Sequence, residues 1–166
     1  FSSSLGEIPI TQATWLDFEN VDLGFHGDGI DSAALDFGLP VGRDVLSMAP
    51  GIVIGVYSRA AENYFSPYEA AAAGNDMGPK GFGNVVTVFH FIDREGSDLP
   101  YYFVATYAHL ESVSVASIAA EFAGLKDGEQ LAVEAGTKLG TVGTSGYSFG
   151  SIGHLHVNFG VAATSD

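Results

Sequence analysis

The chain has 166 residues, of which 46% are hydrophobic and 12% aromatic, and this length and composition predict one globular domain rather than a disordered chain. Six basic residues stand against twenty acidic ones, which gives a formal net charge of -14. Because that charge repels nucleic-acid backbones and anionic lipid, we expect neither as a partner. The absence of cysteine excludes disulfides, thiolate metal sites and a cysteine nucleophile.

The predicted organisation is a single domain with an N-terminal arm. Residues 1–25 have weak periodicity and are expected to pack as an arm on the domain formed by residues 26–166. No run approaches 18 consecutive apolar residues, so no membrane-spanning helix is predicted. The sequence starts at Phe1 and not at an initiator Met, so we expect any targeting segment to be missing from this chain.

Short runs rich in β-branched and aromatic residues, separated by glycine turns, predict an all-β fold. We expect a two-sheet antiparallel β-sandwich or open barrel with long loops and at most one or two short helices. The predicted strands are near 8–10 and at 34–37, 45–46, 52–56, 84–92, 101–110, 130–133, 137–142 and 154–159. Short helices are predicted at 67–73 and 115–122.

The stretch Gly153–Phe159 carries two of the five histidines on one predicted strand. Side chains of a strand alternate between faces, so His154, His156 and Asn158 share one face while the apolar residues between them face the core. The alternative is a solvated polar face whose histidines have no chemical role. Two imidazoles on one strand face instead favour a small site in which the two histidines have different chemical roles.

Two further residues are candidates for the same site. By the same alternation, Ala105, Tyr107 and His109 share one face of the strand 101–110, so His109 joins the other two histidines if the two strands lie in one sheet. The alternative for His109 is a histidine exposed at the rim of a sheet. Asp36 lies inside an apolar strand and needs a partner. Because lysine and arginine are scarce, a metal ion or an imidazole is expected there; the alternative is an Asp capping the turn at Gly38.

A set of two histidines and one aspartate is what a catalytic zinc site requires, because three protein ligands leave the fourth position for a water. The remaining histidines then transfer protons and stabilise the tetrahedral oxyanion. The sequence has no H-E-x-x-H helix. A zinc enzyme with this sequence would therefore be built on strands.

Five ordered motifs resemble those of the lysostaphin/LytM-type zinc metallopeptidases, which have the duplicated hybrid motif fold. The motifs are a histidine followed by an aspartate, G-x-P-V with a following G-x-V strand, G-x-G-N, Y-x-H-L, and G-x-S-x-G before a final H-L-H. They lie in the segments 35–56, 81–90, 107–110 and 139–160, with the first histidine upstream. The similarity covers residues 26–160, nearly the whole domain.

The resemblance implies a role for each histidine. His26, Asp36 and His156 match the ligands of one zinc ion. His109 and His154 match the pair that activates the water or stabilises the transition state, and which of the two is the base is left open. His90 is interpreted as a structural or supporting residue.

The sequence departs from the family pattern at two places. The common spacing puts the first histidine four residues before the aspartate, and that position is Ser32. His26 lies ten residues before Asp36, and Asp28 or Asp31 is an alternative oxygen ligand. Extra residues at 147–152, before H-L-H, are expected to form a wall of the cleft.

The expected function is therefore a secreted or periplasmic bacterial zinc endopeptidase that cuts peptide cross-links of peptidoglycan. We expect a monomer with no nucleic-acid partner and no membrane insertion. One alternative is a catalytically inactive domain of the same fold that binds cell wall or activates an amidase. A histidine phosphocarrier domain of a sugar transport system is a further alternative, but it has no use for Asp36 or for the YAHL motif.

Overall fold

The computed structural model describes residues 10–13, 24–25, 34–62, 67–92, 101–148 and 153–161. It consists mostly of strands, as predicted. The strands are β1 (Ile10–Ala13), β2 (Gly24–Phe25), β3 (Ala34–Gly38), β4 (Asp44–Leu46), β5 (Gly51–Tyr57), β6 (Asn84–Ile92), β7 (Tyr101–Leu110), β8 (Leu131–Val133), β9 (Lys138–Thr141) and β10 (His154–Val161). The helices are α1 (Pro67–Ala72), the 3-10 turn η1 (Pro79–Gly81) and α2 (Ser112–Ala123).

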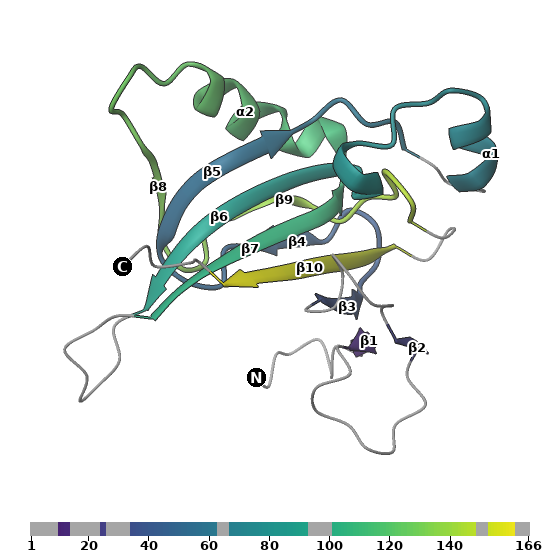
Figure 1. The fold of residues 1–166 in the computed structure, drawn as a ribbon, viewed down its shortest axis with the longest axis horizontal. Coiled ribbons are helices and arrows are strands. Elements are labelled where there is room, and N and C mark those ends of the chain that lie inside the picture. Colours follow the sequence, from purple (N-terminus) through teal and green to yellow (C-terminus); the bar gives the residue numbers. More distant parts are fainter. Residues whose placement is uncertain are drawn as a thin grey trace.

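The strands form two sheets of very unequal size (Figure 1). The large sheet has the order β2-β1-β3-β10-β7-β6-β5-β8, and β4 pairs with β9 in a separate ribbon. Neighbouring strands are antiparallel except for β1 and β2, which run parallel. The predicted all-β class with two antiparallel sheets and few helices is confirmed, although the smaller sheet is only a two-stranded ribbon.

Strands β6 and β7 form the long hairpin that the sequence predicts. Their register pairs Thr87 with Thr106 and Phe91 with Tyr102. Both strands are rich in valine, threonine and aromatic residues, which fit a pleated and partly buried surface. The hairpin places β7 in the middle of the large sheet, next to β10, so the histidines of these two strands belong to adjacent strands.

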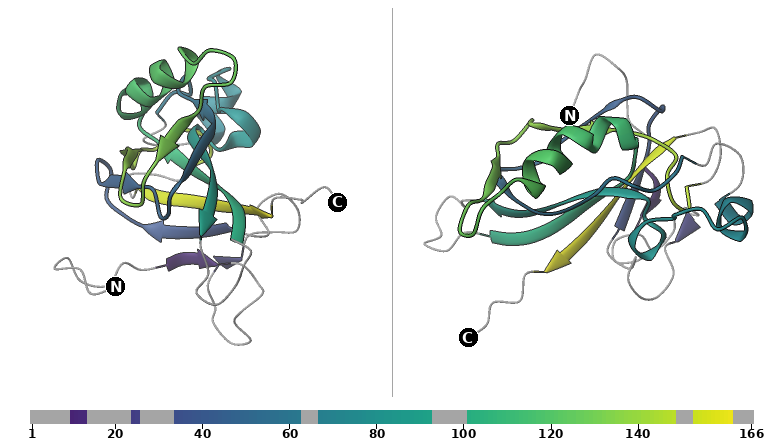
Figure 2. Two further views of the ribbon diagram at one scale, coloured as in Figure 1. Left: turned by 90° about the vertical axis from the view of Figure 1, so that its left-hand side faces the viewer. Right: turned by 90° about the horizontal axis from the view of Figure 1, so that it is seen from above.

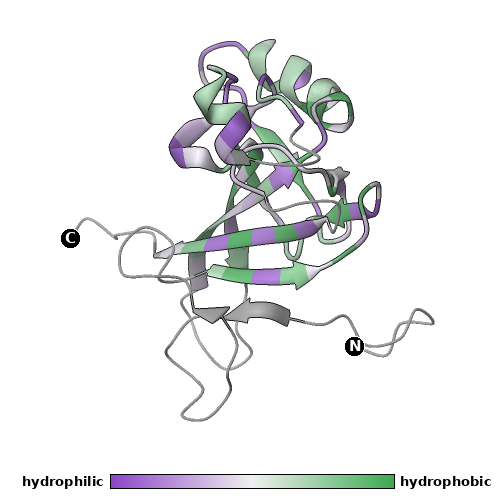
Figure 3. Cartoon of the chain, turned by 90° about the vertical axis from the view of Figure 1, so that its right-hand side faces the viewer, coloured by the Kyte–Doolittle hydropathy of each residue, from purple (hydrophilic) through white to green (hydrophobic). Residues whose placement is uncertain are grey.

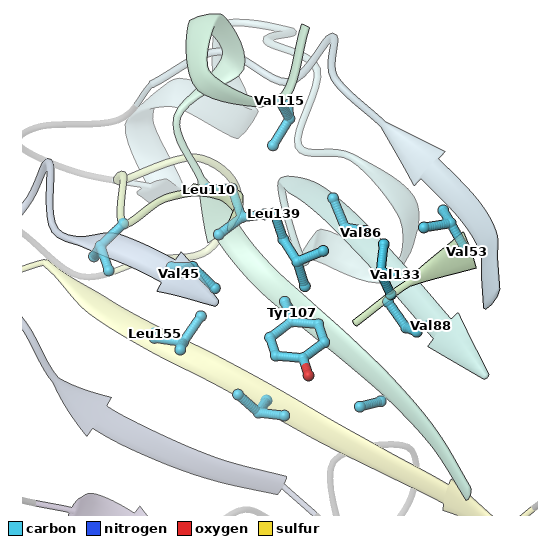
Figure 4. Packing of buried hydrophobic residues seen from close by; sticks show 13 residues of the cluster. Val45, Val53, Val86, Val88, Tyr107, Leu110, Val115, Val133, Leu139 and Leu155 are labelled. Atoms are coloured by element: carbon cyan, nitrogen blue, oxygen red, sulfur yellow. The ribbon is translucent and has the colours of Figure 1, made fainter. Parts of the chain in front are cut away.

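The hydrophobic core lies between one face of the large sheet and a cover made of α2, β4 and β9 (Figures 2 and 4). Helix α2 contributes Val115, Ile118 and Phe122, whose spacing puts all three on one face of the helix. Each fully buried valine or leucine contributes about 1.5–3 kcal/mol. The fully or nearly buried members of the core are Val45, Val53, Val86, Val88, Ala105, Tyr107, Leu110, Val115, Val133, Leu139, Val142, Leu155 and Val157.

Strand β10 separates the core from the opposite face of the sheet. Leu155 and Val157 belong to the core cluster, so His154 and His156, which alternate with them, lie on the other face. Hydrophilic and hydrophobic residues alternate along the strands in Figure 3. We call the face of the large sheet that carries His156 the outer face.

Most of the predicted N-terminal arm lies outside the described residues. Within it, β1 pairs with β3 and extends the sheet beyond Asp36. Of the helices in the described ranges, none combines the length and apolar character needed to cross a membrane.

Candidate active site

Asp36 and His156 form the centre of the site because the register of β3 and β10 places them directly opposite each other. Residues opposite each other on an antiparallel pair share one face of the sheet. His156 Nδ1 donates a hydrogen bond to Asp36 Oδ1 at 2.8 Å. Both residues are buried, with His156 at 3% and Asp36 at 5% exposure. The aspartate that the sequence placed in an apolar strand therefore has an imidazole partner.

His154 lies on the same face, two residues before His156 and opposite Gly38. Its Nε2 is 3.8 Å from Asp36 Oδ2, and its Nδ1 is 3.5 Å from Ser148 Oγ, at the outer limit of a hydrogen bond. Its side chain is 17% exposed. His154 is thus the member of the cluster that is open to solvent.

His109 joins this group through an irregularity in β7 that the sequence does not reveal. Tyr107 and Leu110 both belong to the core although they are three residues apart, so strict alternation fails between them. His109 has a φ of 58°, a left-handed conformation that is uncommon outside glycine. The prediction that Ala105, Tyr107 and His109 share one face is therefore wrong: Tyr107 packs in the core while His109 contacts the histidines of the outer face.

The three imidazoles form one cluster. The ring centroids of His109 and His154 are 4.8 Å apart, and those of His109 and His156 are 5.7 Å apart. The ring of Phe82 lies 5.0 Å from that of His156. Three imidazoles and one carboxylate are thus gathered on one face at the start of β10, with an aromatic ring against one of them.

The unusual backbone of His109 is held by hydrogen bonds from neighbouring loops. Its N–H donates to the carbonyl of Phe82 at 2.9 Å, and its carbonyl accepts from the N–H of Gly143 at 2.8 Å. In the side chain, Nδ1 donates to the carbonyl of Ser145 at 2.7 Å. Because a carbonyl only accepts, this bond fixes the tautomer and leaves Nε2 as the ring nitrogen that can accept a proton.

The surroundings of His109 disfavour its charged form. Burial, and after it the neighbouring His154 and His156, lower the pKa of His109 to about 3, although the Ser145 carbonyl and Asp36 act in the opposite direction. His109 is therefore neutral throughout the physiological range.

The loops that hold His109 approach each other closely, which explains two glycine-containing motifs. A Cβ atom on Gly83 would lie 2.4 Å from the backbone of Ser145, and one on Gly146 would lie 2.3 Å from the backbone nitrogen of Gly83. Both glycines also have positive φ. Gly83 of the G-x-G-N motif and Gly146 of the loop before β10 therefore allow the two backbones to pack closely next to His109.

Asn84 and Ser145 fasten these loops to the sheet. Ser145 Oγ accepts from the N–H of Asn84 at 2.9 Å and donates to the carbonyl of Leu110 at 2.8 Å. Asn84 Nδ2 donates to the same Leu110 carbonyl at 3.1 Å and to that of Ala60 at 3.0 Å. Sequence reasoning found the motifs that contain these residues but not their role in orienting His109.

Of the remaining candidate residues, the structure describes only His90. His26 and its alternatives Asp28 and Asp31 lie outside the described residues, as does Ser32. His90 is buried in the core, where Nδ1 donates to the carbonyl of Pro50 and Nε2 bonds the hydroxyl of Tyr107, each at 3.1 Å. The interpretation of His90 as structural agrees with this position.

Asp36 and His156 offer donor atoms of the kinds that zinc takes in proteins. Asp36 Oδ1 and His156 Nδ1 are 2.8 Å apart, and two ligands of one tetrahedral zinc lie roughly 3.3 Å apart when each bond is about 2.0–2.1 Å. The two atoms are therefore close enough to face one ion. Within the described ranges, no group of three or more histidine, cysteine or acidic side chains is placed as a metal site.

No protein-family model and no curated protein matches the sequence. Among solved structures, the chain is similar to a mutant catalytic domain of the prophage-encoded M23 protein EnpA from Enterococcus faecalis. The sequence identity is 21%, the match covers 84% of this chain and 74% of that one, and the TM-score is 0.42.

Proposed function

We propose that the chain is a zinc-dependent metalloendopeptidase that hydrolyses peptide cross-links of bacterial peptidoglycan outside the cytoplasm. The observation that carries the proposal is the grouping of Asp36, His109, His154 and His156 on one sheet face. Residues from strands far apart in the sequence meet there, and they are the residues that the family motifs single out.

In this proposal Asp36 and His156 hold one zinc ion, together with His26. A carboxylate and imidazoles are ligands that zinc commonly takes in catalytic sites. When bound, zinc supplies Lewis-acid polarisation of the scissile carbonyl and a water of lowered pKa. Asp36 and His156 would hold the ion through the two atoms that share a hydrogen bond in its absence, so His156 Nδ1 would give up its proton on binding.

His109 acts at its Nε2 atom. The bond from Nδ1 to the Ser145 carbonyl keeps Nε2 unprotonated and directed away from that loop. With its Nδ1 proton engaged by the Ser145 carbonyl, the neutral ring presents Nε2 as a proton acceptor. This supports His109 as the base of the histidine pair that the sequence left open.

His154 is then the partner that faces the substrate. Its side chain is partly exposed and lies near Asp36 and Ser148. A solvent-accessible imidazole beside a carboxylate is suited to donate a hydrogen bond to an oxyanion or a proton to a leaving amine. The proposed division of labour is therefore proton acceptance at His109 and donation at His154.

Metal analysis and digestion of purified peptidoglycan test the proposal together. One zinc per chain and release of peptide fragments from at least one cross-link type are expected, with both abolished in His156→Ala. Digesting peptidoglycans with glycine-containing cross-bridges and with direct D-amino-acid cross-links identifies the bond. A chain that purifies free of zinc and cuts neither material contradicts the proposal and favours the inactive cell-wall-binding alternative.

A further inference from the structure

Glu62 lies outside the histidine cluster, in the segment that follows β5, yet its carboxylate makes three hydrogen bonds to two distant parts of the chain. Oε1 accepts from the N–H of Ser112 at 3.1 Å. Oε2 accepts from both the N–H and the hydroxyl of Thr144, at 2.8 and 3.1 Å. The backbone of Glu62 also forms an isolated antiparallel bridge with Ser145. One residue thus joins the start of α2 to the loop before β10.

The first of these contacts replaces a missing helix cap. Glu111 occupies the N-cap position of α2 but makes no side-chain cap hydrogen bond. Its carboxylate instead accepts from the hydroxyl of Thr141 at 2.6 Å. The first N–H groups of a helix lack partners within the helix and attract negative charge. Glu62 supplies a carboxylate to that end from a segment 50 residues away in the sequence.

The second contact leads directly to His109. Thr144 precedes Ser145, whose carbonyl accepts the hydrogen bond from His109 Nδ1 at 2.7 Å. Thr144 and Ser145 are both fully buried. Because Glu62 bonds the N–H of Thr144 and pairs with Ser145, it restrains the chain directly before the Ser145 carbonyl, which accepts the hydrogen bond from His109.

We propose that Glu62 is a positioning residue for His109. It links the residues Thr144 and Ser145 to the first turn of α2, so that the Ser145 carbonyl keeps the His109 ring in one orientation and one tautomer. The effect on hydrolysis rests on the proposed function, whereas the effect on the orientation of His109 does not.

Glutamine cannot replace the carboxylate in this position. An ionised carboxylate presents two acceptor oxygens, which here face Ser112 and Thr144. In Glu62→Gln one of these becomes an NH₂ group that faces a backbone N–H. One contact is therefore replaced by two opposed donors while the size of the side chain is kept.

Glu62→Gln and the matched control Glu111→Gln test the proposal. Both variants remove one negative charge near the N-terminus of α2, but only Glu62 contacts Thr144. For zinc-loaded enzyme, Glu62→Gln is expected to lower kcat at least about 10-fold with little change in KM, since small misplacement of a catalytic group mainly affects the chemical step. Glu111→Gln is expected to retain wild-type kcat.

The second readout is the NMR resonance of the His109 Hδ1 proton, which needs no turnover. In the wild type it is expected far downfield and protected from exchange, and in Glu62→Gln it is expected to shift upfield and exchange faster, with no change in Glu111→Gln. Thr144→Val, which removes only the hydroxyl contact, is expected to shift it in the same direction by a smaller amount and serves if Glu62→Gln does not fold.

The outcomes separate the two proposals. An Hδ1 resonance that is the same in wild type, Glu62→Gln and Thr144→Val overturns the positioning role, as does an equal loss of kcat in Glu62→Gln and Glu111→Gln. If the wild type neither binds zinc nor cuts peptidoglycan, the proposed function fails. The shift of Hδ1 in Glu62→Gln still supports the positioning role in that case.

Discussion

Two buried histidines in this molecule show how similar burial can serve different ends. His90 and His109 are 0% and 5% exposed, and each donates Nδ1–H to a backbone carbonyl. At His90 the second nitrogen bonds Tyr107, so both ring nitrogens are used inside the core. The ring of His109 instead lies against the rings of His154 and His156, in the cluster that contains Asp36. What distinguishes the candidate catalytic histidine is its neighbours and not its burial.

The difference between the two histidines is tested most directly by replacing each imidazole in turn. His109→Ala is expected to lower kcat by about 10²–10⁴-fold, because a positioned acid–base group contributes that much. His90→Phe is expected to keep wild-type kcat per folded, zinc-loaded molecule. Kinetics of cross-link hydrolysis, with zinc content measured in parallel, check both. Equal losses in the two variants would show that the distinction is unfounded.

Replacing His90 is expected to lower the free energy of unfolding and not kcat. His90→Phe leaves the Pro50 carbonyl and the Tyr107 hydroxyl without the bonds that His90 makes. Losing partners of buried polar groups costs about 1–3 kcal/mol each, so the free energy of unfolding should fall by an amount of this order. Urea denaturation followed by circular dichroism measures it. A variant as stable as the wild type would contradict a structural role for His90.

The burial of His90 should make the free energy of unfolding depend on pH in the acid range. Burial lowers the pKa of His90 from its usual value of 6.5, so the unfolded chain takes up a proton first as the pH falls. The wild type should therefore lose stability relative to His90→Phe as the pH drops through about 6.5 towards the lower folded pKa, and the difference should be constant above that range. Urea titrations at a series of pH values test this. A gap between the two proteins that does not change with pH would contradict it.

The smallest expected effect concerns the backbone of His109. Its φ of 58° is costly for any residue with a Cβ atom, whereas glycine adopts it readily. His109→Gly is therefore expected to be more stable than His109→Ala by about 1 kcal/mol, although both lose activity. Thermal unfolding of the two variants compares them. If His109→Ala were the more stable of the two, the left-handed conformation would be in doubt.

Most of the fold could be predicted from the sequence, because strand composition and side-chain alternation are local features. The strand Asn84–Ile92 and the hairpin with Tyr101–Leu110 followed from their composition, and the alternation around His154 correctly separated the outer face from the core. The pairing of Asp36 with His156 was anticipated only as a need for a partner. It depends on the register of two strands 120 residues apart, which alternation does not determine.

What could not be predicted depends on loops and on one exceptional backbone angle. The sequence Tyr-Ala-His-Leu contains no local signal that the side chains of β7 stop alternating between faces at His109. The role of the Ser145 carbonyl has no side-chain signature at all. Glu62 is a single acidic residue outside any motif, and only its contacts with Ser112 and Thr144 distinguish it. The position of His26 stays a prediction, since it lies outside the described residues.

The most direct test of the central proposal is an anomalous difference map of the crystallised protein, recorded on both sides of the zinc absorption edge. We expect one peak within about 2.0–2.1 Å of an Asp36 carboxylate oxygen and of His156 Nδ1. A third protein ligand should be visible in the same map and would show whether His26 completes the site. A protein prepared with excess zinc that gives no peak at Asp36 and His156, or a peak only elsewhere, would contradict the proposed metal centre.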